Sequence, residues 1–199
     1  MRNISRLTEA DLVLETPRLR LRPFALADED LASELFTDPE VMKFLDGVIA
    51  PDKIPEETQN ATRRGAGRRL GVWCVADKTS GEKLATAVLL PIPIDTTDVE
   101  WSLLREDSYP EREIEVGYIL KPAVWGRGLA TEICRALVRF AFEATDLPEI
   151  VAVTDPENWA SQRVLTKCGL RHEGTRYAYA AEIPSFRMTR QDWNDIAPE

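Results

Sequence analysis

The segment KPAVWGRGLAT, residues 121–131, places a turn with two glycines, Gly126 and Gly128, directly before a helical pattern. Apolar residues then recur at helical spacing, at Leu129, Ile133, Leu137, Phe140 and Ala144. Apolar runs typical of strands lie before and after this unit, at 113–120 and 149–154. The order strand, glycine turn, helix, strand predicts a βαβ unit.

A glycine turn at the start of a helix has a definite physical consequence. The first N–H groups of a helix lack partners within the helix, and the helix dipole adds positive potential there. Such an end can bind a pyrophosphate, and glycines let the anion approach the backbone closely. The turn lacks the Gly-Lys-Ser/Thr ending of a P-loop and the third glycine of the dinucleotide fingerprint. Taken alone, it is also typical of simple turn chemistry.

The rest of the chain adds further strands and helices. Alternating or apolar runs predict strands at 18–24, 71–77 and 83–92, the last two joined as a hairpin by KTSGE. A helix is expected after Asp28, another short helical piece at 38–45 and a polar helix within 51–71. The segment 93–113 mixes turn formers with a short apolar piece, which favours another strand with loops.

The C-terminal part predicts one helix and a closing antiparallel strand pair. Asp155 is a natural N-cap, Pro156 suits the first helical position and Gly169 ends the helix. TRYAYA and SFRMTR then predict the strand pair. Gly117, inside the strand 113–120, suggests a bulge or the close approach of a ligand. With no repeat or linker in its 199 residues, the chain is expected to form a single domain, 1–199.

Composition limits the function classes. The net charge of −9 argues against general binding of nucleic acid or anionic membrane and favours a cationic partner. The basic cluster at 63–69 is either a phosphate-binding patch or a helix end with solvated arginines. No apolar run reaches membrane-spanning length and the N-terminus has no signal-peptide core, so a cytoplasmic location is expected. Three scattered cysteines and a single histidine, His172, predict no metal site, no disulfide and no Ser-His-Asp triad.

Several long motifs, in order along the chain, carry a family resemblance: ETPRLRLRPF, DPEVMKFL, EVGYILKPAVWGRGLATE, DPENWASQRVLTKCGLRHEGT and RMTRQDW. Together they resemble the GNAT acetyltransferase superfamily, and more narrowly its Rim-type branch, named for N-terminal acetylation of ribosomal proteins. The resemblance spans nearly the whole chain. It implies an α/β GNAT fold, with a mixed, mostly antiparallel central sheet, helices on both faces and a splay between the parallel strands 113–120 and 149–154.

The resemblance also implies that acetyl-CoA is the co-substrate and lies in the splay. Its pyrophosphate would bind the backbone amides of the turn and helix start: Gly126, Arg127, Gly128, Leu129, Ala130 and Thr131. The backbone of Tyr118, Ile119 and Leu120 would pair with the pantetheine arm, and Asn158 and Ser161 would line the thiol end. From the residues alone, the favoured interpretation of Asn158 is a helix N-terminal polar residue, and that of Ser161 an ordinary helix-surface residue.

Transfer to an amine requires the neutral amine. An α-amino group has a pKa of about 7.7–8.0 and lysine about 10.4, so an N-terminal amine needs only a modest base. Glu115 is the candidate base, directly or through a water, if burial raises its pKa toward about 6–7; otherwise it is a solvated or ion-paired residue. Glu100 is a second candidate. A backbone N–H near Tyr118–Leu120 is the candidate oxyanion donor.

The leaving thiolate needs an acid, and here the chain departs from the superfamily pattern. Many members use a tyrosine on or near the second helix, where this chain has none; Tyr177 and Tyr179 follow later. Ser161, or a water it holds, is the candidate acid. Trp125 stands where many members carry Arg or Gln, although tryptophan suits the Rim-type branch. The segment 93–113 is longer than the usual connection and could shape the acceptor pocket.

The leading hypothesis is therefore an acetyl-CoA-dependent N-acetyltransferase acting on a protein N-terminus or a small amine. A non-catalytic acyl-CoA-binding or sensor module of the same fold is the alternative, and a third reading is a related fold without CoA affinity. Monomer and homodimer are both open.

Overall fold

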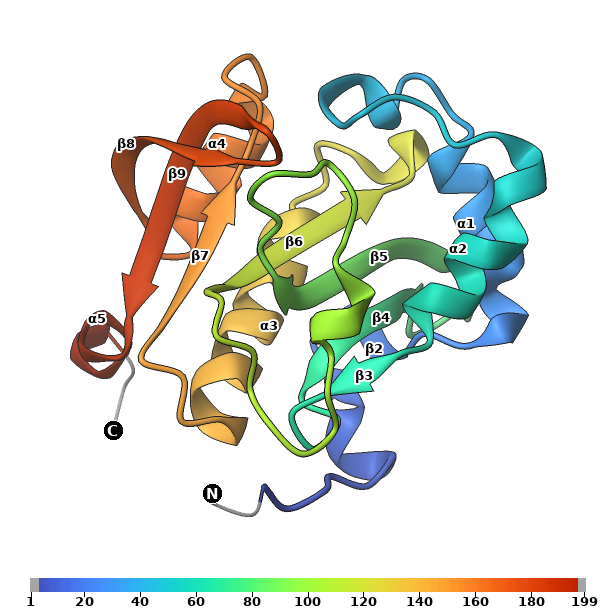
Figure 1. Ribbon diagram of the computed structural model, residues 1–199. Coiled ribbons are helices and arrows are strands. Elements are labelled where there is room, and N and C mark those ends of the chain that lie inside the picture. Colours follow the sequence, from blue (N-terminus) through green and yellow to red (C-terminus); the bar gives the residue numbers. More distant parts are fainter. Residues whose placement is uncertain (1–3, 197–199) are drawn as a thin grey trace.

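The computed structural model of the chain describes residues 4–196. Within these residues, all strands belong to one sheet, in the order β1-β2-β4-β5-β6-β7-β9-β8, and β3 pairs with β4 at its side (Figure 1). The strands are β1 Leu14–Glu15, β2 Leu19–Pro23, β3 Arg64–Gly65, β4 Leu70–Asp77, β5 Lys83–Pro91, β6 Ile114–Leu120, β7 Glu149–Val153, β8 Arg171–Ala178 and β9 Ala181–Thr189. The α-helices are α1 Glu29–Phe36, α2 Ile54–Ala61, α3 Leu129–Ala144, α4 Trp159–Lys167 and α5 Arg190–Ile196.

The predicted splay lies between β6 and β7. These two strands are parallel, and their register holds one pair, Glu115 with Val151, whereas the sheet's other described neighbours are antiparallel. Beyond Glu115 the two strands diverge, as Figure 1 shows. Residues 117–120 therefore leave their β7-facing backbone edge without a strand partner in the described sheet.

Two apolar layers cover the sheet, one on each face. The stripe of α3, including Ile133 and Leu137, packs in one core with Ile114, Val116 and Leu120 of β6. Side chains of α1 and α2 form a second core on the other face, against which Ile119 packs. Because side chains alternate along a strand, Tyr118 shares the α3 face, and Glu115 and Gly117 lie on the opposite face.

Two helix starts differ from the expectation. Asp28 occupies the N-cap position of α1, but its carboxylate accepts bonds from Arg22 (2.7 Å to each oxygen) and from the Ala25 N–H (3.0 Å). Asp155 does not cap α4: its Oδ1 accepts from the Glu157 N–H at 2.7 Å in a preceding turn. Asn158 is the cap, and α4 begins at Trp159. The cap is therefore Asn158, three residues after the expected Asp155, because its side chain reaches the Ser161 N–H.

Two further expectations, a strand within 93–113 and a bulge at Gly117, are corrected. The structure has no strand within 93–113, where it places one 3₁₀ turn, Trp101–Leu103. The register between β5 and β6 runs unbroken from Ala85–Leu120 to Pro91–Ile114, so Gly117 forms no bulge there. A Cβ at position 117 would lie 2.9 Å from Val88 Cγ2. The glycine thus accommodates a neighbouring side chain.

Candidate active site

The glycine turn, residues 126–128, leaves the first N–H groups of α3 without backbone partners among the described residues. Gly126 and Gly128 have φ of +73° and +77°, a left-handed conformation that side chains disfavour. Gly128 is the N-cap of α3, and no side chain caps the helix there. Among the described residues, no backbone acceptor pairs with the N–H groups of 126–131; the first bond back to the turn runs from Glu132 N to Gly128 O, at 3.2 Å. These donors therefore remain available to a ligand that accepts hydrogen bonds.

Arg18, directly before β2, stabilises the conformation of this turn. Arg18 donates to the Arg127 carbonyl at 2.9 Å and pairs with Glu132 at 2.7 Å. Thr16 Oγ1 and the Arg18 N–H also donate to Glu132, at 2.5 and 2.9 Å. Burial acts to raise the pKa of Glu132, but these bonds outweigh it and the pKa lies below its ordinary value. The turn is therefore held in place by a residue that the sequence does not single out.

The free edge of β6 runs from the turn toward the strand pairing. The carbonyl of Leu120 accepts from the Trp125 indole N–H at 2.8 Å, which ties the end of the strand to the turn. Leu120 O is therefore already engaged. Tyr118 and Ile119 lie along the part of β6 that has separated from β7.

The start of α4 faces this edge through Ser161. Asn158 Oδ1 accepts from the Ser161 N–H at 3.0 Å, so the Asn158 side chain caps the helix. Ser161 Oγ lies 3.2 Å from the Tyr118 hydroxyl, a contact across the splay. Burial raises the pKa of Tyr118, so its hydroxyl stays protonated at neutral pH. The sequence assigned only the backbone of Tyr118 and missed its side chain, because nothing local indicates that it reaches α4.

Glu115 lies where β6 and β7 part. Its side chain is buried, with the residue 8% exposed, and burial raises the pKa of Glu115 to about 7. The Tyr179 hydroxyl donates to Glu115 Oε1, and the Arg176 charge opposes the effect of burial. Glu100, the second candidate base, lies in the 93–113 loop and pairs with Arg112 at 3.5 Å. Of these two candidates, Glu115 is thus the buried carboxyl.

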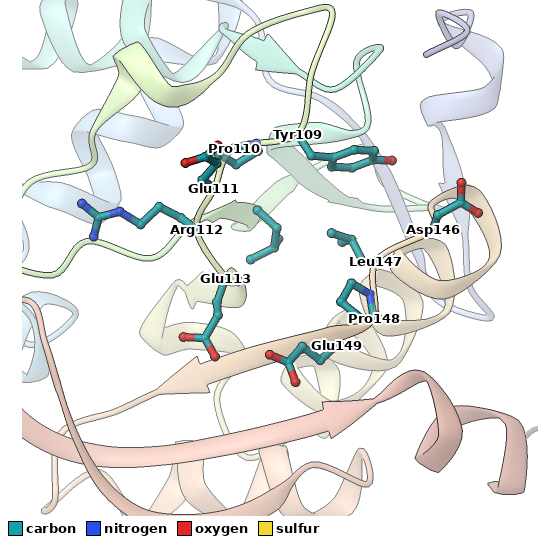
Figure 2. A pocket seen from close by; sticks show the side chains of 10 residues that line it. Tyr109, Pro110, Glu111, Arg112, Glu113, Asp146, Leu147, Pro148 and Glu149 are labelled. Carbon is teal, nitrogen blue, oxygen red and sulfur yellow. The ribbon is translucent and has the colours of Figure 1, made fainter. Parts of the chain in front are cut away.

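A shallow cavity of about 370 Å³ opens beyond the other end of β6 and β7, between 109–114 and 146–149 (Figure 2). Its lining includes the carboxylates of Glu111, Glu113, Asp146 and Glu149. Glu113 and Glu149 lie near each other in Figure 2, and both pair with Arg187. The lining contains none of the expected cofactor residues. The cavity is therefore separate from the splay.

Residues 4–196 offer no metal-ligand cluster and no membrane-spanning helix. No group of three His, Cys, Asp or Glu side chains there could hold a metal ion. None of the helices in this range is long and apolar enough to cross a membrane.

Comparison with known proteins places the chain in a family. The family model described as "Acetyltransferase (GNAT) domain" matches residues 18–171. The FsC-acetyl coenzyme A-N(2)-transacetylase of Aspergillus fumigatus is 30% identical over 196 residues, which cover 93% of this chain and 79% of that protein. This similarity runs over nearly all of the chain.

Solved structures share the fold at lower identity. An acetyltransferase from Agrobacterium tumefaciens str. C58 superposes with a TM-score of 0.70 at 22% identity, covering 88% of this chain and 93% of the other. RimL, a ribosomal L7/L12 alpha-N-protein acetyltransferase in complex with coenzyme A, superposes with a TM-score of 0.65 at 13% identity, covering 89% and 97%. At these identities the likeness concerns the fold.

Proposed function

Because the chain belongs to the GNAT acetyltransferase family and is thus an acetyl-CoA-dependent N-acetyltransferase, we propose that the splay between β6 and β7 is its active site and a primary α-amine its acceptor. The observation that carries this proposal is Glu115: a buried carboxyl with a pKa of about 7, at the point where the two strands part. A structural ion-pair residue would not need this combination of burial and position.

The chain's own groups bind the cofactor along one line. The free amides from Gly126 to Thr131 hold the pyrophosphate, with Arg18 fixing the Arg127 carbonyl behind the turn. The free edge of β6 at Tyr118–Leu120 pairs with the pantetheine arm, mainly through Tyr118 and Ile119, since Leu120 O is engaged by Trp125. Asn158 Nδ2 remains available to the arm while its Oδ1 caps α4.

The two faces of the splay divide the chemistry. Bound acetyl-CoA supplies an acetyl thioester, whose carbonyl carbon forms a bond to the amine nitrogen while the C–S bond breaks. Glu115, on one face, takes the proton that the amine nitrogen loses. On the other face Ser161, whose Oγ is held against the Tyr118 hydroxyl at 3.2 Å, passes a proton to the departing sulfur, directly or through a water, and regains a proton from solvent. A backbone N–H near Tyr118 stabilises the negative carbonyl oxygen.

The pKa of Glu115 bears on the acceptor. Proton transfer from an α-ammonium group, pKa about 7.7–8.0, to a carboxylate with a pKa of about 7 is uphill by roughly one pKa unit, about 1.4 kcal/mol. From a lysine-like ammonium, pKa about 10.4, the transfer is uphill by over three pKa units, about 4–5 kcal/mol. This difference supports a protein N-terminus or another amine of low pKa. The Rim-type motifs support the former.

A small-molecule amine is the second candidate acceptor. It is supported by the relative whose printed name is an N(2)-transacetylase and by the net charge of −9, which suits a cationic substrate. Both candidates use the same base and cofactor site. The two candidates differ in the size and shape of the acceptor that must fit beside Glu115.

The test is thiol release from acetyl-CoA with a matched panel of amines: short peptides with free N-termini, the same peptides N-acetylated but retaining a lysine, spermidine, and an amino sugar. Release with free N-termini that N-acetylation abolishes supports the proposal. Turnover with Glu115→Gln unchanged removes Glu115 from the role. Acetyl-CoA binding by calorimetry without thiol release from any amine would favour the non-catalytic binding module instead.

A further inference from the structure

The connection between β8 and β9 brings a second tyrosine to Glu115. Tyr179 and Ala180 form this two-residue tip, and Figure 1 shows that it projects toward the loop 93–113. From there the Tyr179 hydroxyl donates to Glu115 Oε1, across 64 residues of sequence. The contact joins a loop tip to the buried carboxylate of the proposed base.

The backbone of this tip is sterically unfavourable. Tyr179 and Ala180 have φ of +52° and +55°. Two consecutive left-handed residues are the geometry of a tight hairpin turn that usually carries Asn or Gly, because a Cβ crowds the backbone there. A residue with a large side chain keeps such a conformation only where its surroundings hold it.

Three sets of contacts hold it. Tyr179 N donates to Pro93 O at 3.1 Å, and Ala180 N donates to Ile94 O at 2.8 Å. The Tyr179 ring packs on the buried cluster of Ile92, Val151 and Ala178. The third contact is the bond to Glu115 itself. The hydroxyl is therefore held in one position, because residues 92–94 and Val151 of β7 contact the strained turn that carries it.

We propose that Tyr179 is a positioning residue for the base: its hydroxyl orients the Glu115 carboxylate and stabilises the ionised form, and thereby sets the pH range in which the enzyme works. This inference rests on the proposed role of Glu115. Tyr179 acts through that carboxylate and is not required to touch the substrate.

The surroundings of Glu115 show why the hydrogen bond from Tyr179 matters. Its strand neighbours on β5 and β7 are apolar, Leu90 and Val151. The nearby cations, Arg176 from β8 and Arg187 from β9, both pair with Glu113. Among the described residues, Tyr179 supplies the side-chain hydrogen bond to the Glu115 carboxylate.

The sign of the effect follows. Burial raises the pKa of Glu115 to about 7, while the Tyr179 bond and the Arg176 charge act to lower it. Burial also raises the pKa of Tyr179, so its hydroxyl keeps its proton and acts as the donor. Removing that hydroxyl leaves a carboxylate without its donor in an apolar site, so protonated Glu115 persists to higher pH.

The first test needs no acceptor. The carboxyl carbon of Glu115 is titrated by ¹³C NMR in the full chain, its resonance identified by its loss in Glu115→Gln. Tyr179→Phe, which keeps the ring and the backbone conformation, should move the titration midpoint upward by about one pH unit. Tyr177→Phe, on the same hairpin and half-exposed, is the matched control and should leave it in place. An unmoved midpoint in Tyr179→Phe overturns the inference.

The second test is the pH profile of kcat/KM with acetyl-CoA and a short peptide carrying a free N-terminus. Tyr179→Phe should shift the low-pH limb by the same amount, which lowers the rate about tenfold below the midpoint and restores it near pH 9. An equal loss at every pH, or no shift, overturns the positioning role. Should Glu115→Gln keep its full rate, the proposed base fails, an outcome distinct from failure of Tyr179 alone.

Discussion

Because Glu115 is buried, we predict that the free energy of unfolding depends on pH in a way that requires no substrate to measure. Its pKa is 4.5 in an unfolded chain and about 7 in the folded protein, where burial penalises the charge. The folded state therefore binds this proton more tightly. The resulting stabilisation is fully present below pH 4.5 and is lost as pH rises through 7. This difference in pKa corresponds to about 3 kcal/mol, most of which is lost between pH 5 and pH 8.

Glu115→Gln removes this titration while keeping the shape of the neutral acid. Urea unfolding of both proteins at intervals from pH 5 to pH 8 gives the two stability curves, and groups common to both cancel in their difference. We expect the native chain to lose about 2–3 kcal/mol of unfolding free energy relative to the variant over this range.

Glu113→Gln is the matched control on the same strand. Burial acts to raise the pKa of Glu113, but bonds from Arg176 and Arg187 outweigh it and the pKa lies below its ordinary value. Its contribution therefore changes only at pH values below about 4.5, and its curve should stay parallel to that of the native chain from pH 5 to pH 8. Parallel curves for Glu115→Gln as well would refute the reasoning, because they would mean that Glu115 is solvated.

Three further predictions concern the cofactor site and the strand beside it. Gly128→Asp should weaken acetyl-CoA binding at least tenfold more than Gly128→Asn in calorimetry, because both side chains occupy the left-handed position but only Asp repels the pyrophosphate; equal affinities would contradict the anion site. Arg18→Gln should lower acetyl-CoA affinity about three- to tenfold by releasing the Arg127 carbonyl, a factor that corresponds to losing one hydrogen bond; a native dissociation constant would show that the brace has no effect on binding. Gly117→Ala should destabilise the fold by about 1–3 kcal/mol in urea unfolding, because its Cβ would lie 2.9 Å from Val88, and Val88→Ala in the same chain should recover part of the loss; no recovery would point to another cause.

Much of the fold is predictable from short stretches of the sequence. The periodicity of residues 129–144 predicts α3, and the apolar runs around it predict β6 and β7, because each pattern repeats within a few residues of itself. The motifs in order indicate the GNAT fold, and the splay between β6 and β7 is confirmed. The glycine turn is partly local, since glycine favours the left-handed conformation of residues 126 and 128, whereas the bond from Arg18 that holds the turn comes from a distant segment.

Where neighbouring residues compete, the sequence is less decisive. Asp155 and Asn158 both suit a helix cap, and the structure uses Asn158, whose side chain reaches the Ser161 N–H. The 93–113 segment has a strand-like apolar piece, but no partner strand pairs with it in the described sheet. These outcomes depend on what packs against each segment.

The chemistry of the candidate site was decided by the tertiary structure. The sequence names Glu115 and the condition it must meet, a raised pKa, but burial is a property of the packed sheet. Tyr179 lies 64 residues from Glu115, Ser161 lies 43 from Tyr118, and Glu132 lies 114 from Arg18. Local propensity is set by each residue's neighbours along the chain, whereas desolvation and these long-range hydrogen bonds exist only once distant segments have been brought into register.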